Sequence, residues 1–138
     1  MGVLLRVFGV VCIAVGALHI ALGLQADQML GAGLSGEALA NASLDSQNRF
    51  YGAQFVLVGA VAWMCGGDLE RHATLFRVLM AVFFLGGLAR LVSLLLLGWP
   101  APMVQLLAVS ELVIPPLLLL WHARLTQARR PASRSSEH

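Results

Sequence analysis

The chain has 138 residues, of which 59% are hydrophobic and 12% charged, and its formal net charge is +2. A soluble domain typically has about 45–50% apolar and about 25% charged residues, so the composition predicts one membrane domain with no room for a second fold. The charge is too small and the chain too apolar for nucleic acid to be a partner. Two cysteines, both in or beside apolar runs, do not suit a disulfide framework.

Four apolar runs predict four membrane-spanning helices. Such a helix needs ~20 residues, within a range of about 17–25, and the predicted spans cover residues 3–24, 49–67, 75–97 and 103–121. No run alternates with period two, as the strands of a barrel do. The predicted fold class is therefore all-α, a polytopic transmembrane four-helix bundle over residues 1–125, followed by a disordered cytoplasmic tail over residues 126–138.

The first predicted span carries glycines at heptad spacing. Gly9, Gly16 and Gly23 share a stripe with Cys12 and His19, because residues three and four apart lie on one face of a helix. Small residues let membrane helices approach closely, so the stripe is expected to point inward and to carry His19 with it. The apolar run is also longer than the ~7–15 residues of a signal-peptide core, which favours an uncleaved first span.

A polar connection over residues 25–48 separates the first two spans, and residues 35–42 within it could form a short interfacial helix. The second span repeats glycine at Gly52, Gly59 and Gly66. The two glycine stripes together predict a tight bundle whose interior is lined by small and polar groups. The start of the second span is rich in polar side chains: Gln47, Asn48, Arg49, Tyr51 and Gln54.

The third span contains an arginine, Arg90, in an otherwise apolar run. A charge at that depth costs at least ~2.5–3.5 kcal/mol and therefore needs a partner or a use. Arg90 lies eight residues before Gly98, and Glu111 lies nine residues after Pro102, so both sit about 12–13 Å from the turn at ~1.5 Å per residue. The tight turn makes the two helices antiparallel neighbours, which predicts an Arg90–Glu111 pair with a bidentate fork.

The placement of the arginines predicts the orientation of the chain. Arg6, Arg71, Arg77 and the arginines after the last span lie at one end of the predicted helices, and Arg49 alone lies at the other. Cytoplasmic loops carry an excess of basic residues. Both termini are therefore expected in the cytoplasm, an N-in/C-in topology.

Polar groups converge on the outer half of the predicted bundle, where they form a candidate binding cluster. A structural reading makes the ion pair a device that fixes which helices meet, whereas a functional reading makes the cluster a site for an anionic or hydroxyl group. One histidine and one acid are too few for a metal motif, and no cofactor motif is visible, so neither a metal nor a cofactor is expected. The candidate residues are Arg90, Glu111, His19, Arg49, Ser93, Gln54 and Tyr51.

Several residues of this cluster belong to sequence motifs that resemble those of a known family. The chain resembles a bacterial membrane family catalogued as domain of unknown function 4345, and the resemblance covers most of the chain. It rests on Arg49-Phe50-Tyr51-Gly52-Ala53, on Gly86-Gly87-Leu88-Ala89-Arg90-Leu91-Val92-Ser93, on the Gly98-x-Pro100 turn and on Glu111. In that family an acidic residue often precedes the turn glycine, where this chain has Leu97. The resemblance implies a four-span protein of the bacterial cytoplasmic (inner) membrane and no settled activity.

Three functions remain open at the level of the sequence. The leading expectation is a small binding or accessory protein, which holds an amphiphile in an outward-opening polar pocket or packs against a larger membrane complex or a second copy of itself. The first alternative is a membrane-embedded enzyme that uses Glu111 and His19 for proton transfer, and the second is a structural subunit of a larger complex. Membrane lipids are expected partners in each case.

Overall fold

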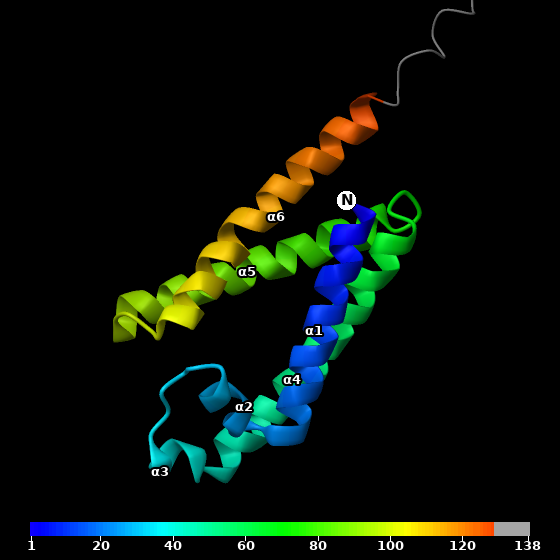
Figure 1. Ribbon diagram of the computed structural model, residues 1–138. Coiled ribbons are helices and arrows are strands. Elements are labelled where there is room, and N and C mark those ends of the chain that lie inside the picture. The colour runs from blue at the N-terminus through cyan, green and yellow to red at the C-terminus, as the bar shows by residue number, and fades with distance from the viewer. Residues whose placement is uncertain (129–138) are drawn as a thin grey trace, which may run out of the picture.

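Four long helices dominate the computed structural model, which describes residues 1–128 (Figure 1). They are α1 (Gly2–Leu22), α4 (Ala42–Gly67), α5 (Ala73–Leu97) and α6 (Pro102–Ala128), and each is long and apolar enough to cross a membrane. The predicted all-α class and its four apolar helices are confirmed. Since α6 runs to Ala128, the remainder of the predicted tail, residues 129–138, lies outside the described residues.

The glycine stripes of α1 and α4 bring these two helices into close contact. A Cβ atom added at Gly16 would lie 2.5 Å from the carbonyl oxygen of Gly52, and one added at Gly59 would lie 2.5 Å from the carbonyl oxygen of Gly9. Both separations are too short for any side chain, so the backbones approach at a distance that only glycine allows. The role predicted for the two stripes is confirmed for this pair of helices.

Helices α5 and α6 form a second antiparallel pair. A Cβ atom added at Gly87 would lie 2.8 Å from Cγ of Leu112 and 3.2 Å from the backbone carbon of Glu111. Gly87 thus opens the surface of α5 so that the Glu111 region of α6 can lie against it. The turn over residues 98–101 joins the two helices, and Gly98 ends α5 with φ +88°, a conformation that favours glycine.

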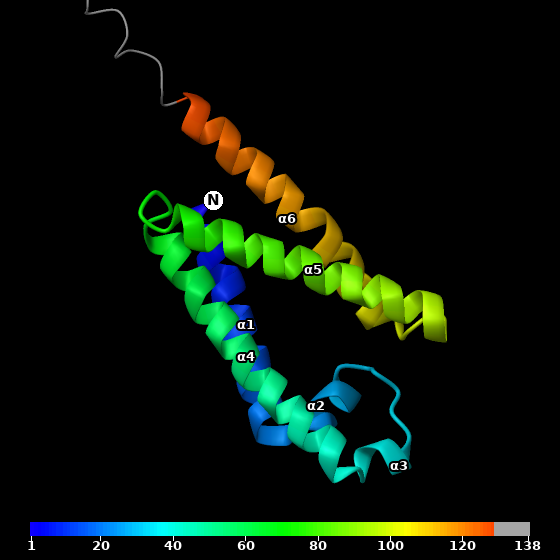
Figure 2. The ribbon, with the colours of Figure 1, turned by 180° about the vertical axis from the view of Figure 1, so that it is seen from behind.

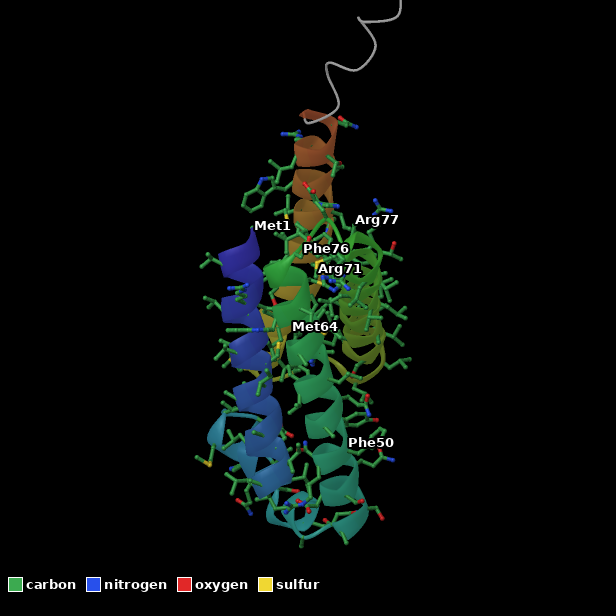
Figure 3. The ribbon with its side chains drawn as sticks, turned by 90° about the vertical axis from the view of Figure 1, so that its right-hand side faces the viewer. Met1, Phe50, Met64, Arg71, Phe76 and Arg77 are labelled. Carbon is green, nitrogen blue, oxygen red and sulfur yellow. The ribbon has the colours of Figure 1, made fainter. Side chains whose placement is uncertain are left out.

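The two pairs share one apolar core at a single end of the molecule, which we call the closed end. Every long helix contributes to this core. Its buried residues are Leu5, Ala62, Cys65, Phe76, Leu79, Met80 and Leu118. Phe8 of α1 also packs edge to face against Phe83 of α5, with 5.2 Å between ring centroids. Figure 3 places Met1, Phe76, Arg71 and Arg77 at this end and Phe50 toward the other.

Away from the closed end the two pairs diverge, as Figures 1 and 2 show from opposite sides. The single tight bundle predicted from the sequence is therefore not what the structure shows. The close-packing glycines explain the difference, because those of α1 and α4 face each other and Gly87 faces α6. The closest helix contacts are made within each pair, and the apolar side chains at the closed end join one pair to the other.

The connection between α1 and α4 contains two short helices, α2 (Leu24–Met29) and α3 (Gly36–Leu39). Ser35 caps α3 by accepting a hydrogen bond from the amide of Ala38, so part of the predicted interfacial helix is present. Helix α4 begins at Ala42 rather than at the predicted Arg49, because Asn41 accepts hydrogen bonds from the first free amides of the helix. The polar first turns of α4 thus extend beyond its apolar run.

Candidate functional site

Arg90 and Glu111 form an ion pair between α5 and α6. Nε of Arg90 donates to Oε2 of Glu111 at 2.8 Å, which confirms the pair predicted from helix depth. The geometry is a single hydrogen bond from Nε rather than the expected bidentate fork. The Glu111 side chain is 11% exposed and that of Arg90 36% exposed, so the carboxylate is buried between the helices while the guanidinium reaches outward.

Glu111 lies beside α5 near Gly86. Gly86 stands one turn before Arg90, and a Cβ atom there would lie 3.6 Å from Oε2 of Glu111, in ordinary van der Waals contact. The ion pair lies at the contact between α5 and α6 and helps to fix their register.

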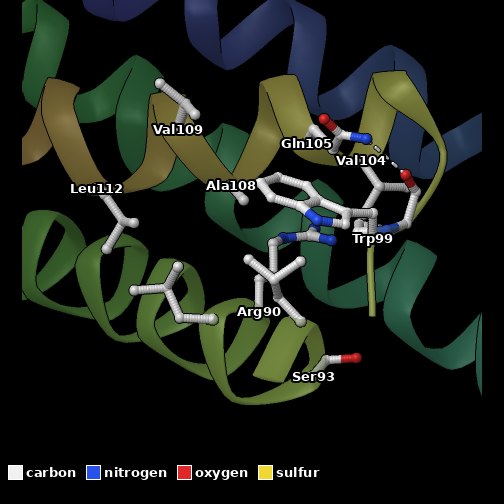
Figure 4. A pocket seen from close by; sticks show the side chains of 11 residues that line it. Arg90, Ser93, Trp99, Val104, Gln105, Ala108, Val109 and Leu112 are labelled. Atoms are coloured by element: carbon white, nitrogen blue, oxygen red, sulfur yellow. Dashed lines mark hydrogen bonds between the residues drawn. The ribbon is translucent and has the colours of Figure 1, made fainter. Parts of the chain in front are cut away.

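A pocket of about 310 Å³ lies beside the ion pair, between α5, α6 and the turn that joins them (Figure 4). Its volume is at the lower end of the ~300–1,000 Å³ typical of small-molecule sites. The walls are largely apolar, and Trp99 stands at the turn with 79% of its surface exposed. The lining residues are Arg90, Leu91, Ser93, Leu94, Trp99, Pro100, Val104, Gln105, Ala108, Val109 and Leu112.

The polar groups of the pocket retain unused hydrogen-bonding capacity. A guanidinium has five N–H donors, and within residues 1–128 that of Arg90 makes its one hydrogen bond through Nε. Nε2 of Gln105 donates to the carbonyl of Pro100 at 2.8 Å, and Oε1 of Gln105 has no donor in the described part of the chain. In Figure 4 the guanidinium lies within the pocket, whereas the Ser93 hydroxyl points away from it.

A second polar group lies at the other end of α1 and α4 from the shared core, and we call it the α1–α4 polar network. It contains two hydrogen-bonded groups, His19 with Asp27 and Asn48, and Asp45 with Arg49. Nδ1 of His19 lies 2.7 Å from the carbonyl oxygen of Val15, and Nε2 lies 3.1 Å from Oδ1 of Asp27. The amide of Asn48 donates to the other oxygen of Asp27. Each ring nitrogen of His19 therefore already faces an oxygen.

The network also fastens α2 to the α1–α4 pair. Asp45 accepts from the amide of Leu24 at 3.1 Å and from Nε of Arg49 at 2.7 Å. Arg49 in turn donates through one terminal nitrogen to the carbonyls of Ile20 and Ala21, at 2.7 and 2.9 Å. The carbonyls at the end of α1, which have no partner within the helix, are thus satisfied by a side chain of α4.

The structure divides the predicted cluster between the two helix pairs. Arg90, Glu111 and Ser93 belong to α5–α6, whereas the other four residues belong to α1–α4: His19, Arg49, Tyr51 and Gln54. Tyr51 is 59% exposed, its hydroxyl donates to Gln47 at 3.4 Å, and Gln54 is exposed. The structure brings the first three together beside one pocket and does not bring the whole set to a single site.

The cluster predicted from the sequence lacks two acids and two pocket residues. Asp45 precedes Arg49 by four residues, a spacing that signals a helical ion pair, but the apolar run that predicts this helix does not extend back to Asp45. Asp27 lies in α2, which is too short to show a periodic pattern. Trp99 and Gln105 line the pocket through the turn geometry. Within residues 1–128, no group of three or more His, Cys, Asp or Glu side chains could hold a metal ion.

These features define a class of protein, a multi-pass membrane protein with four candidate spanning helices and an ion pair between two of them. Residues 1–122 match the family described as domain of unknown function (DUF4345), and the chain belongs to that family. No curated protein matches the chain, and no solved structure matches it.

Proposed function

We propose that this protein binds an amphiphile within the membrane and holds its polar head in the α5–α6 pocket. The observation that carries the proposal is Arg90, whose guanidinium lies in a pocket with largely apolar walls and spends one of its donors on Glu111. An arginine inside a membrane is costly unless it is paired or used. The remaining donors offer a hydrogen-bonding site for an oxygen-bearing head, and the apolar walls offer a surface for its chain.

A native mass spectrometry experiment tests the proposal. Protein extracted gently from its own membrane should retain one amphiphile per chain. The variant Ala108→Trp, which fills the pocket, should lose that molecule because the indole occupies the same volume. Ala123→Trp is the matched control, since Ala123 is an exposed residue of the same helix and does not line the pocket. Equal retention by wild type and Ala108→Trp would overturn the proposal.

We also propose that the protein lies in the bacterial cytoplasmic membrane with both termini in the cytoplasm. The closed end carries Arg71 and Arg77 (Figure 3), and Arg6 lies in the first turns of α1 with its guanidinium 5.5 Å from the centre of the Trp63 ring. Basic residues favour the cytoplasmic side, and tryptophans such as Trp99 favour the membrane interface. In this orientation the turn that borders the pocket lies at the outer face.

The orientation has a direct test. Alkaline phosphatase fused after His138 should be inactive, because it folds with disulfides only outside the cytoplasm, whereas a fluorescent protein fused there should fluoresce. The same pair of fusions inserted after Gly33, in the α2–α3 connection, should give the opposite pattern. An active phosphatase at the C-terminus would contradict the proposed topology.

The divergence of the two helix pairs supports a second candidate, an accessory protein that packs against a second copy of itself or a larger membrane complex. Apolar side chains remain exposed along each pair, among them Leu57, Val92 and Leu106. Lipid covers such surfaces as well as protein does. The mass of the gently extracted species decides between the amphiphile-binding protein and the accessory protein, because a bound partner adds a polypeptide mass and an amphiphile does not.

A further inference from the structure

We propose that the ligand of the α5–α6 pocket is a neutral amphiphile with a hydroxyl group on its head, rather than an anionic lipid. This inference rests on the proposed binding function and names the chemistry of the ligand. Three features of the pocket support it: its net charge, the shortage of free backbone amides in the first turn of α6, and the unused acceptor of Gln105.

The first feature is the balance of charge. The guanidinium of Arg90 is already neutralised by the Glu111 carboxylate, which lies 2.8 Å from Nε. Among residues 1–128, no other charged side chain lines the pocket. A phosphate monoester carries about −1.5 to −2 charges, so it would be attracted by one cation and repelled by an anion directly behind it. A neutral head meets the same donors without that repulsion.

The second feature is the first turn of α6, which borders the pocket. The start of a helix can bind an anion through its free backbone amides. Here Pro102 has no amide hydrogen, and the amides of Val104 and Gln105 both point to the carbonyl of Ala101, at 2.9 and 3.1 Å. Most of the backbone amides of this turn that could bind a phosphate are therefore absent or already occupied.

The third feature is Gln105. The carbonyl of Pro100 accepts a hydrogen bond from Nε2 of this side chain, and within residues 1–128 Oε1 has no donor. A purely accepting head, such as a phosphate dianion, cannot donate to Oε1. A head with a hydroxyl group can donate to Oε1 while its other oxygens accept from Arg90.

The size of the pocket agrees with a small head group. Its volume of about 310 Å³ is at the lower end of the ~300–1,000 Å³ typical of small-molecule sites. Leu91, Leu94 and Val109 supply apolar surface for the beginning of an acyl chain.

The test uses three probes with identical acyl chains. They are dioleoylglycerol, its methyl ether, which lacks the hydroxyl donor, and dioleoyl phosphatidic acid. The full chain in mild detergent is incubated with equal amounts of the three, and native mass spectrometry counts the bound species. Wild type should bind dioleoylglycerol at least tenfold better than phosphatidic acid, and roughly fivefold better than the methyl ether, as expected for one net hydrogen bond.

Variants connect this preference to the ion pair. Glu111→Gln keeps an acceptor for Nε of Arg90 but leaves the pocket with a net positive charge. The ratio of bound dioleoylglycerol to bound phosphatidic acid should therefore fall at least tenfold. Adding Arg90→Gln restores neutrality and should abolish that shift. Glu37→Gln removes an acid from α3, on the other helix pair, and should leave the ratio unchanged.

The outcomes separate this inference from the function on which it rests. Three results would overturn the neutral hydroxyl ligand. The wild type could prefer phosphatidic acid, it could bind the methyl ether as well as dioleoylglycerol, or Glu111→Gln could leave the ratio of these probes unchanged. If the wild type binds no probe while Ala108→Trp still loses the amphiphile of the cell membrane, this inference fails and the proposed function stands. If Glu111→Gln cannot be purified, the competition on the wild type decides alone.

Discussion

At the scale of single residues, the Arg90–Glu111 pair combines a structural and a binding role in different atoms. Nε and the buried carboxylate hold α5 against α6, while the terminal nitrogens of the guanidinium make no hydrogen bond within residues 1–128 and border the pocket. An ion pair inside a membrane adds little stability by itself, because desolvation offsets most of the Coulomb attraction. The presence of this ion pair inside the membrane is easier to understand if one of its two side chains also contacts a ligand.

The pair predicts a characteristic double-mutant cycle. Arg90→Met leaves the Glu111 carboxylate buried without a partner and should destabilise the protein, by less than the ~3–5 kcal/mol of a fully buried pair because Arg90 is 36% exposed. Arg90→Met combined with Glu111→Met should recover most of that loss, since no charge then remains. The measurement is the free energy of unfolding in mixed micelles. A double variant as unstable as the sum of the two single variants would contradict a direct interaction.

At the scale of helices, the sequence predicts elements better than their ends or their partners. Apolar length locates all four long helices, and counting residues from the turn is enough to place Arg90 opposite Glu111. The early start of α4 depends on Asn41, a cap that lies outside the apolar run. A glycine stripe shows that a helix packs closely, but it does not show against which helix it packs, so the division of the cluster could not be predicted.

The α1–α4 contact gives a prediction at this scale. Gly59→Ala places a Cβ atom 2.5 Å from the carbonyl oxygen of Gly9, which must push the two backbones apart. Overpacking of this kind costs typically ~1–3 kcal/mol, so the melting temperature in detergent should fall. Gly36→Ala is the matched control, because an added Cβ there meets nothing within 4 Å. Equal melting temperatures for the two variants would show that α1 and α4 do not approach as closely as described.

At the scale of the whole molecule, the protein consists of two helix pairs joined at the closed end. Glycine-mediated backbone contacts hold α1 against α4, the Gly87 contact and the ion pair hold α5 against α6, and the shared core lies at one end. A joint of this kind allows the far ends to move relative to each other more readily than the helices within a pair. The pocket and the α1–α4 polar network lie on different sides of that joint.

This arrangement predicts different distance distributions within and between the pairs. With Cys12 and Cys65 replaced by alanine, spin labels on Ser43 of α4 and Leu97 of α5 report on the distance between the pairs, and labels on Val92 of α5 and Leu106 of α6 report on one pair. All four labelled positions are exposed. Pulsed electron paramagnetic resonance should give a broad distribution for the first set and a narrow one for the second, because the Gly87 contact and the ion pair hold α5 against α6. Labels on Arg77 and Leu125 of the α5–α6 pair extend the control toward the closed end and should also give a narrow distribution. A between-pair distribution as narrow as both controls would mean that contacts beyond the closed-end core hold the two pairs in one fixed arrangement.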